Sequence, residues 1–180
     1  MILCAGNSEN FDFAQPVGVG MIEVSMNLTR LCLFDKPEFL LFIGSAGSYG
    51  NYNIFDIVES KTASNIELAF LTNDAYTPLD NVISTNTTNK KEPIVNSSNY
   101  ISTAEQLTQK FLKLGVEIEN MEFFAVLKIA QEFNIPAGGV FCITNYTNKN
   151  AHEDFVKNHE KAKELLSVHV KKRIKELTQK

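Results

Sequence analysis

The sequence of 180 residues lacks features that mark several large classes of protein. It has no tryptophan and only two arginines, Arg30 and Arg173, although arginine is the side chain best suited to clamp a phosphate group. No apolar run reaches the ~18 residues needed to cross a bilayer, so we expect no contact with a membrane. The net charge is −4 and no basic patch stands out, which argues against nucleic acid as a partner.

Cysteine is also scarce. Cys4, Cys32 and Cys142 lie in apolar segments, and none of them forms a C-x-x-C pair. This pattern is typical of buried free thiols, which predicts a reducing compartment and, without a recognisable leader segment, a cytoplasmic location. The three histidines gather near the carboxyl end without further ligands at suitable spacing, so we expect no metal site.

Strand-like and helix-like segments alternate along the chain, which predicts one α/β domain covering residues 1–180 around a largely parallel sheet. Apolar segments of strand type occupy residues 1–5, 11–19, 39–43, 54–58, 66–71, 116–118 and 137–143. Helical spacing of apolar residues occupies 21–34, 102–114, 121–133 and 153–178. Residues 72–99 are rich in Asn, Thr and Ser, and we expect them to form a long polar connection.

Two glycine-rich stretches could approach a ligand. Gly18-Val19-Gly20 precedes the helix at 21–34, where backbone N–H groups could bind an anion, although a tight structural turn explains it equally well. Gly44-Ser45-Ala46-Gly47 follows a buried strand, so we expect a turn at the sheet edge where α/β proteins bind ligands. A purely structural turn remains the alternative.

Three polar side chains also stand at element ends. Glu122 begins an apolar helix, where the helix dipole alone accounts for a carboxylate, or where the carboxylate could bind sugar hydroxyls. Asn145 ends a buried strand and could contact a ligand or form an Asx turn. Tyr100, at the end of the polar connection, could stack on a flat ring or mark the border of the core.

In order and spacing, these segments resemble the nucleoside phosphorylase and nucleosidase family, whose members cleave N-ribosidic bonds. VGVGMIEVSMNLTRL resembles the family's glycine turn and first helix, and DKPEFLLFIGSAGS resembles its strand with G-S-A-G. NSSNYIS occupies the place of the base-stacking stretch, and IENMEFFAVLKIAQEFNIP resembles the M-E-x-x-A helix. CITN stands where the family has an S-D pair.

This resemblance implies a three-layer α/β sandwich around a mixed, partly closed sheet, with a shortened amino-terminal part. It also implies homodimers or higher homo-oligomers and a small-molecule nucleoside as the ligand. By the same resemblance, Glu122 would bind the ribose 2′- and 3′-hydroxyls beside Met121, and Tyr100 would stack near the base.

The resemblance places the attacking nucleophile beside Ser45 and Gly20, with Glu9 positioning a water molecule. No cofactor is implied, although phosphate is the co-substrate of the phosphorylases. The chain departs from them because Phe42 stands where they have an arginine three residues before the serine. Water is therefore easier to accommodate as the nucleophile than phosphate.

Asn145 would face the purine N7, in place of the aspartate that protonates this atom in enzymes acting on aminopurines. An amide cannot act as a general acid at neutral pH. The asparagine instead resembles 6-oxopurine phosphorylases and futalosine hydrolases, which favours a hypoxanthine-type base. The alternative is a catalytically inactive nucleoside-binding protein with the same fold.

Overall fold

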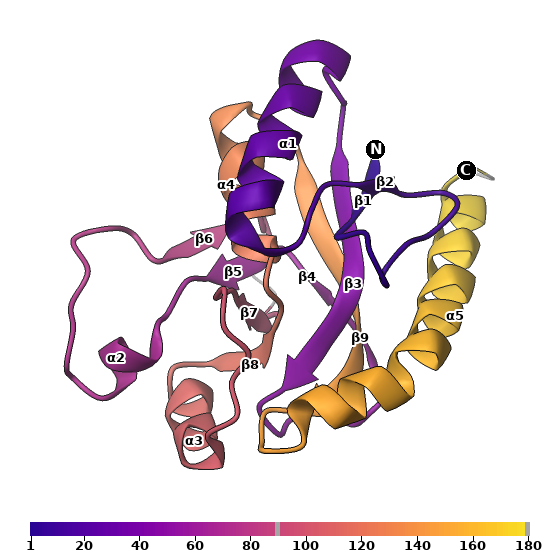
Figure 1. Cartoon of the computed structure of the whole chain (residues 1–180). Helices are drawn as coiled ribbons and strands as arrows, with labels where there is room; N and C mark the ends of the chain where they lie inside the picture. Colours follow the sequence, from indigo (N-terminus) through magenta and orange to yellow (C-terminus); the bar gives the residue numbers. More distant parts are fainter. Residues whose placement is uncertain (89–90, 179–180) are drawn as a thin grey trace.

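A mixed sheet of nine strands, with helices on both of its faces, forms the centre of the computed structural model (Figure 1). The structure describes residues 1–88 and 91–178. The strands are β1 (Ile2–Cys4), β2 (Gln15–Pro16), β3 (Leu40–Ser48), β4 (Ile57–Ser60), β5 (Thr62–Ser64), β6 (Val82–Ser84), β7 (Ile94–Asn96), β8 (Val116–Glu119) and β9 (Ala137–Tyr146). The helices are α1 (Gly20–Asp35), α2 (Leu68–Leu71), α3 (Glu105–Lys113), α4 (Phe123–Glu132) and α5 (Ala151–Thr178).

The sheet follows the order β2-β1-β3-β8-β7-β5-β6, and β9 pairs with both β3 and β4 beside this path. Five of its eight strand pairings are parallel, which confirms the predicted mixed and mainly parallel sheet. The expected partial closure of the sheet is wrong, because the described strands do not close on themselves and the sheet is open at β2 and β6.

The long strands β3 and β9 run through the middle of the sheet. They pair in parallel from Leu40↔Ala137 to Ser48↔Tyr146, and almost all of their residues are buried. Such continuous burial is typical of strands that are covered on both faces. The turn predicted at residues 44–47 is wrong, because this stretch stays paired with β9 across a bulge between Ala46 and Gly47.

Helices cover the two faces of the sheet in separate apolar layers. Val24 and Leu28 of α1 pack with Leu127 of α4 in one core cluster, whereas Leu166 and Val170 of α5 belong to another. Figure 1 shows α1 beside α4, with α5 on the opposite side of β3 and β9. This helix–sheet–helix arrangement confirms the three-layer sandwich.

Local predictions failed mainly between residues 62 and 104. The strand predicted at 66–71 is wrong, because the short helix α2 occupies this segment and the strand β5 precedes it. The polar connection predicted at 72–99 contains the short strands β6 and β7. Helix α3 begins at Glu105 rather than at Ser102, whose backbone N–H instead donates to Glu119.

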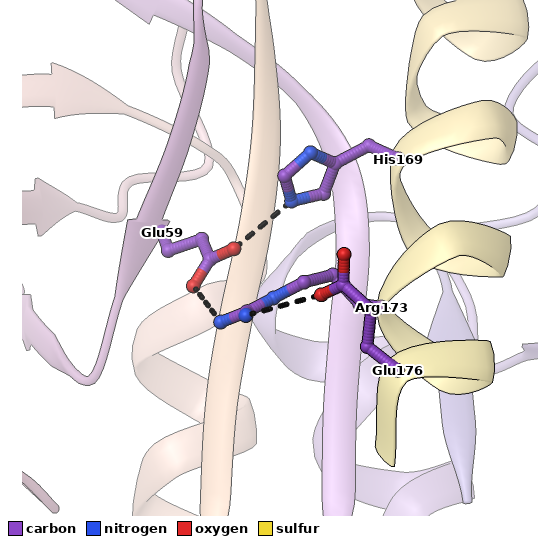
Figure 2. Close-up of polar contacts among 4 residues, drawn as sticks. All are labelled: Glu59, His169, Arg173 and Glu176. Carbon is purple, nitrogen blue, oxygen red and sulfur yellow. Dashed lines mark hydrogen bonds and ion pairs between the residues drawn. The ribbon is translucent and has the colours of Figure 1, made fainter. Parts of the chain in front are cut away.

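The far end of α5 is tied to β4 by an ionic cluster (Figure 2). The Glu59 carboxylate lies 2.9 Å from His169 Nε2 and 3.3 Å from Arg173, which also lies 3.9 Å from Glu176. Burial raises the pKa of Glu59, but the hydrogen bond from His169 and the charge of Arg173 outweigh burial and lower this pKa overall. Within the described ranges, no helix is both long and apolar enough to cross a membrane.

Candidate active site

A cavity of about 310 Å³ opens where β3, β8 and β9 end. The loop between β1 and β2, the start of α4 and the first turns of α5 complete its wall. The polar side chains that line it include Glu9, Ser45, Glu119, Glu122, Asn145 and His152. The cavity therefore brings together residues that lie far apart in the sequence, at the sheet edge where α/β proteins bind ligands.

Glu122 is a buried carboxyl group on the wall of this cavity, with an exposed fraction of 3%. Glu122 occupies the N-cap position of α4, but its side chain does not cap the helix. Instead, Asn120 Oδ1 accepts the backbone N–H groups of Glu122 and Phe123, each at 3.0 Å. The Glu122 side chain is free to cross to α1, where its Oε1 accepts the Gly20 N–H at 2.8 Å. Burial raises the pKa of Glu122 to about 7, and the charge of Glu9 adds to this effect.

Glu9 reaches the same cavity from the loop between β1 and β2. Its Oε1 accepts the Ser45 N–H at 2.8 Å, and this bond ties the loop to the end of β3. Burial raises the pKa of Glu9, while the charges of His159 and Lys163 on α5 act in the opposite direction. Two carboxyl groups thus line one cavity, and the charge of Glu9 makes ionisation of Glu122 less favourable.

Asn145 is held in one orientation by its neighbours. The Thr144 hydroxyl donates to Asn145 Oδ1 at 2.9 Å, and Asn145 Nδ2 donates to the Tyr146 carbonyl at 3.2 Å. The Nδ2 group also lies 3.0 Å from where a Cβ on Gly47 would stand. These two bonds use one lone pair of Oδ1 and one N–H of Nδ2, so this cavity-lining amide has a second N–H that neither bond uses.

The structure places the other predicted residues as follows. Ser45, Met121 and Tyr100 line the cavity, but Tyr100 is 77% exposed and lies at the rim rather than over an enclosed ring site. Gly20, which was expected to line the cavity, is not among the lining residues, although its N–H donates to Glu122. The neighbouring Val19 borders the cavity instead.

Sequence reasoning assigned no role to several lining residues, among them Glu119, Asn120, His152 and Phe155. Glu119 and Asn120 belong with Glu117 and Glu122 to a polar cluster in the sequence, which marks the neighbourhood of the cavity but not which of its side chains line it. His152 and Phe155 have no local signal, because only the packing of α5 across β9 and β3 brings them to the cavity.

Three backbone N–H groups at the start of α1 are already bonded to side chains. The N–H groups of Val19 and Met21 donate to Glu23 at 2.9 Å and to Asn99 at 3.1 Å, and that of Gly20 donates to Glu122. No lysine or arginine is among the described residues that line the cavity. In the part of the chain that is described, no three His, Cys, Asp or Glu side chains are grouped to hold a metal.

Residues 93–175 match the family model of the phosphorylase superfamily. The resemblance to the nucleoside phosphorylase and nucleosidase family is confirmed. The matched segment contains four of the predicted site residues, Tyr100, Met121, Glu122 and Asn145. The other three, Glu9, Gly20 and Ser45, lie in the preceding part of the chain, and Glu9 and Ser45 line the cavity.

Solved structures with the same fold include nucleosidases and a futalosine hydrolase. A mutant of 5′-methylthioadenosine nucleosidase from Helicobacter pylori, with 5′-methylthioadenosine in its active site, is 16% identical with a TM-score of 0.82 over 97% of each chain. Futalosine hydrolase from Helicobacter pylori is 16% identical with a TM-score of 0.81 over 97% of this chain and 96% of its own. No curated protein sequence matches significantly.

Proposed function

We propose that the protein hydrolyses the N-ribosidic bond of a purine or purine-like nucleoside, with a 6-oxopurine as the leaving base. The observation that carries this proposal is the position of Glu122. Its carboxyl group is buried on the wall of a cavity of nucleoside size, and Oε1 accepts the Gly20 N–H. The Asn120 side chain and the Met121 N–H also hydrogen-bond to this carboxyl group, whose roughly four lone-pair sites leave capacity for a ligand. A carboxylate in this position suits the two vicinal hydroxyls of a ribose.

The proposed reaction has a dissociative character. As the bond from C1′ to the base nitrogen breaks, its electron pair leaves with the base and positive charge develops on the ribose. Glu122 holds the sugar by its hydroxyls, and Asn145 donates a hydrogen bond to the base as negative charge builds on it. A water molecule forms the new bond to C1′, and Glu9 accepts its proton.

Water is favoured over phosphate for electrostatic reasons. Three carboxyl groups, Glu9, Glu119 and Glu122, line the cavity and would repel an anion. The backbone donors at the start of α1 are already bonded, and Phe42 stands where the phosphorylases have an arginine. Structures of similar fold include a nucleosidase and a futalosine hydrolase, which agrees with hydrolysis.

The amide of Asn145 supports the choice of base. Its fixed N–H donor can stabilise an acceptor on the departing purine, such as N7 or the 6-oxo group. It cannot supply a proton, and this absence of a general acid supports a non-catalytic nucleoside-binding protein as the second candidate.

Incubation with inosine, with and without phosphate, tests the proposal. Chromatography should detect hypoxanthine and free ribose at the same rate in both cases. Ribose 1-phosphate formed only with phosphate would instead identify a phosphorylase. Binding of inosine without release of base over hours would identify the binding protein. Adenosine and 5′-methylthioadenosine, tested in parallel, would reveal an aminopurine enzyme.

A further inference from the structure

Asn120 is a buried asparagine that lines the same cavity as Glu9 and Glu122, and the proposed mechanism gives it no role. Its exposed fraction is 7%, and it lies between the end of β8 and the start of α4. A buried amide is costly unless its donors and acceptors are bonded, so its partners indicate what it does.

The amide oxygen of Asn120 organises the start of α4. Oδ1 accepts the backbone N–H groups of Glu122 and Phe123, each at 3.0 Å. This contact fixes the stretch of backbone that carries the Glu122 side chain. Capping alone requires only an oxygen in this place, and a serine hydroxyl could provide one.

The amide nitrogen of Asn120 has a different set of contacts. Nδ2 donates to the Ser45 carbonyl of β3 at 3.1 Å, and the Asn120 side chain also hydrogen-bonds to the Glu122 carboxyl group. Ser45 in turn donates its backbone N–H to Glu9 Oε1 at 2.8 Å. A chain of hydrogen bonds therefore runs from Glu9 through the backbone of Ser45 and the Asn120 side chain to Glu122.

This chain of bonds joins two carboxyl groups that oppose each other electrostatically. The charge of Glu9 disfavours ionisation of Glu122, whereas the Gly20 N–H, the Asn120 side chain and the Met121 N–H favour it. Misplacement of a reacting group by about 1 Å can cost about 100-fold in rate. The distance between the carboxyl group that binds the sugar and the one that activates water therefore has to be held.

We propose that Asn120 is a positioning residue of the reaction, which holds the Glu122 carboxyl group in a fixed place relative to Glu9 through the backbone of Ser45. This inference rests on the proposed function. Asn120 acts through its neighbours in this role and does not need to touch the substrate. It keeps the carboxylate that binds the ribose hydroxyls at a constant distance from the carboxylate that accepts the proton of the attacking water.

The test replaces Asn120 with serine, which keeps an oxygen for the start of α4 but has no amide N–H. We expect Asn120→Ser to lower kcat for inosine by about 10- to 100-fold. We also expect the acid limb of its pH–rate profile to move to higher pH, because the Glu122 carboxylate loses a donor and its pKa rises further. A role limited to capping would leave both quantities unchanged.

The matched control is Asn96→Ser. Asn96 is a buried asparagine at the end of β7, and it is not among the described residues that line the cavity. Its bonds have a similar pattern, because Oδ1 accepts the Ser64 hydroxyl at 2.9 Å and the Ile66 N–H at 2.8 Å, while Nδ2 donates to the Ile66 carbonyl at 3.0 Å. This control should lose stability in thermal melts but keep the wild-type kcat and pH–rate profile.

The inference and the proposed function fail in different ways. If the wild type releases base but Asn120→Ser keeps its kcat or its pH–rate profile, the positioning role is refuted and hydrolysis stands. If the wild type releases no base, hydrolysis is refuted, and calorimetric binding of inosine decides about Asn120. Binding that is weakened in Asn120→Ser but kept in Asn96→Ser supports the hold on Glu122, whereas equal or undetectable binding refutes it.

A measurement on the wild type decides if Asn120→Ser does not fold. Heteronuclear NMR can follow the Asn120 side-chain amide while the pH is raised through the pKa of Glu122, which burial brings to about 7. We expect the amide signals to shift with this ionisation and to lose the shift in Glu122→Gln. Signals that do not change with pH, or that change alike in Glu122→Gln, overturn the inference.

Discussion

Replacing Glu122 with glutamine should stabilise the protein at neutral and alkaline pH while impairing its activity. The pKa of Glu122 is raised from 4.5 to about 7 by burial, with a contribution from the charge of Glu9. The folded protein therefore binds a proton that the unfolded chain releases between these two pH values. Because the folded state holds more protons, the stability of the wild type falls as pH rises from 4.5 to about 7. Glutamine does not ionise, so the stability of the variant does not fall in this way as pH rises.

The size of the effect follows from the shift. A change from 4.5 to about 7 corresponds to about 3 kcal/mol. Only 3% of the residue is exposed, so solvent screens little of this energy. Glutamine keeps an oxygen that can accept the Gly20 N–H at the position of Oε1. For a chain of this length, about 3 kcal/mol corresponds to a rise in Tm of about 6–12 °C.

Thermal melts at pH 5, 6, 7 and 8 measure the effect. The difference in Tm between Glu122→Gln and the wild type should be small at pH 5 and should widen up to about pH 8. Glu164→Gln, which changes an exposed carboxylate on α5, shows what the same substitution does elsewhere. A difference that stays constant with pH, or a variant that melts below the wild type at pH 8, would refute the reasoning.

Four further predictions concern the cavity and α5. Glu122→Ala should lower kcat/KM for inosine by about 100-fold or more, because it removes the proposed grip on the ribose; steady-state kinetics would show otherwise if turnover is retained. Asn145→Asp should shift the ratio of adenosine to inosine cleavage towards adenosine by about tenfold, since a carboxylic acid can donate a proton that an amide cannot, and an unchanged ratio would remove Asn145 from the base site. Added phosphate should change neither the rate of hypoxanthine release nor the Tm, because no lysine or arginine is among the described lining residues and the N–H groups of Val19, Gly20 and Met21 are already bonded; saturable stimulation by phosphate would contradict this. Glu59→Gln should lower the free energy of unfolding by less than about 1 kcal/mol at pH 7, because the carboxylate is 45% exposed, and this difference should vanish as pH falls through the lowered pKa of Glu59; a larger loss in denaturant titrations would give the α5 cluster a greater role.

Much of the fold could be predicted from apolar periodicity alone. The helix predicted at 21–34 corresponds to α1, and the run at 137–143 corresponds to β9, because both have patterns that belong to a single element. The segment at 66–71 misled the prediction because a short apolar run fits a strand and a helix equally well. The sequence did not predict strands β6 and β7, because each has only three residues and depends on pairing with β5.

The candidate site was predictable only in part. Glu122 and Asn145 could be found because each stands in a short motif at the end of an element. Glu119 could not be assigned, since its place beside Asn145 depends on the antiparallel register of β8 and β3. Likewise, the bond from Gly20 to Glu122 joins residues 102 positions apart, and no local pattern indicates it.

The small size of Gly47 has a consequence for how this protein could lose its activity. A methyl group at this position would press on Asn145 Nδ2, Glu119 Cγ and, at 3.3 Å, Thr147 Cγ2. The backbone there is ordinary strand, so alanine would be compatible with the sheet. An added methyl group would thus push against Asn145 and Glu119, two polar side chains that line the cavity, although the strand itself accepts alanine. One substitution is therefore enough to disturb the cavity without unfolding the sheet around it.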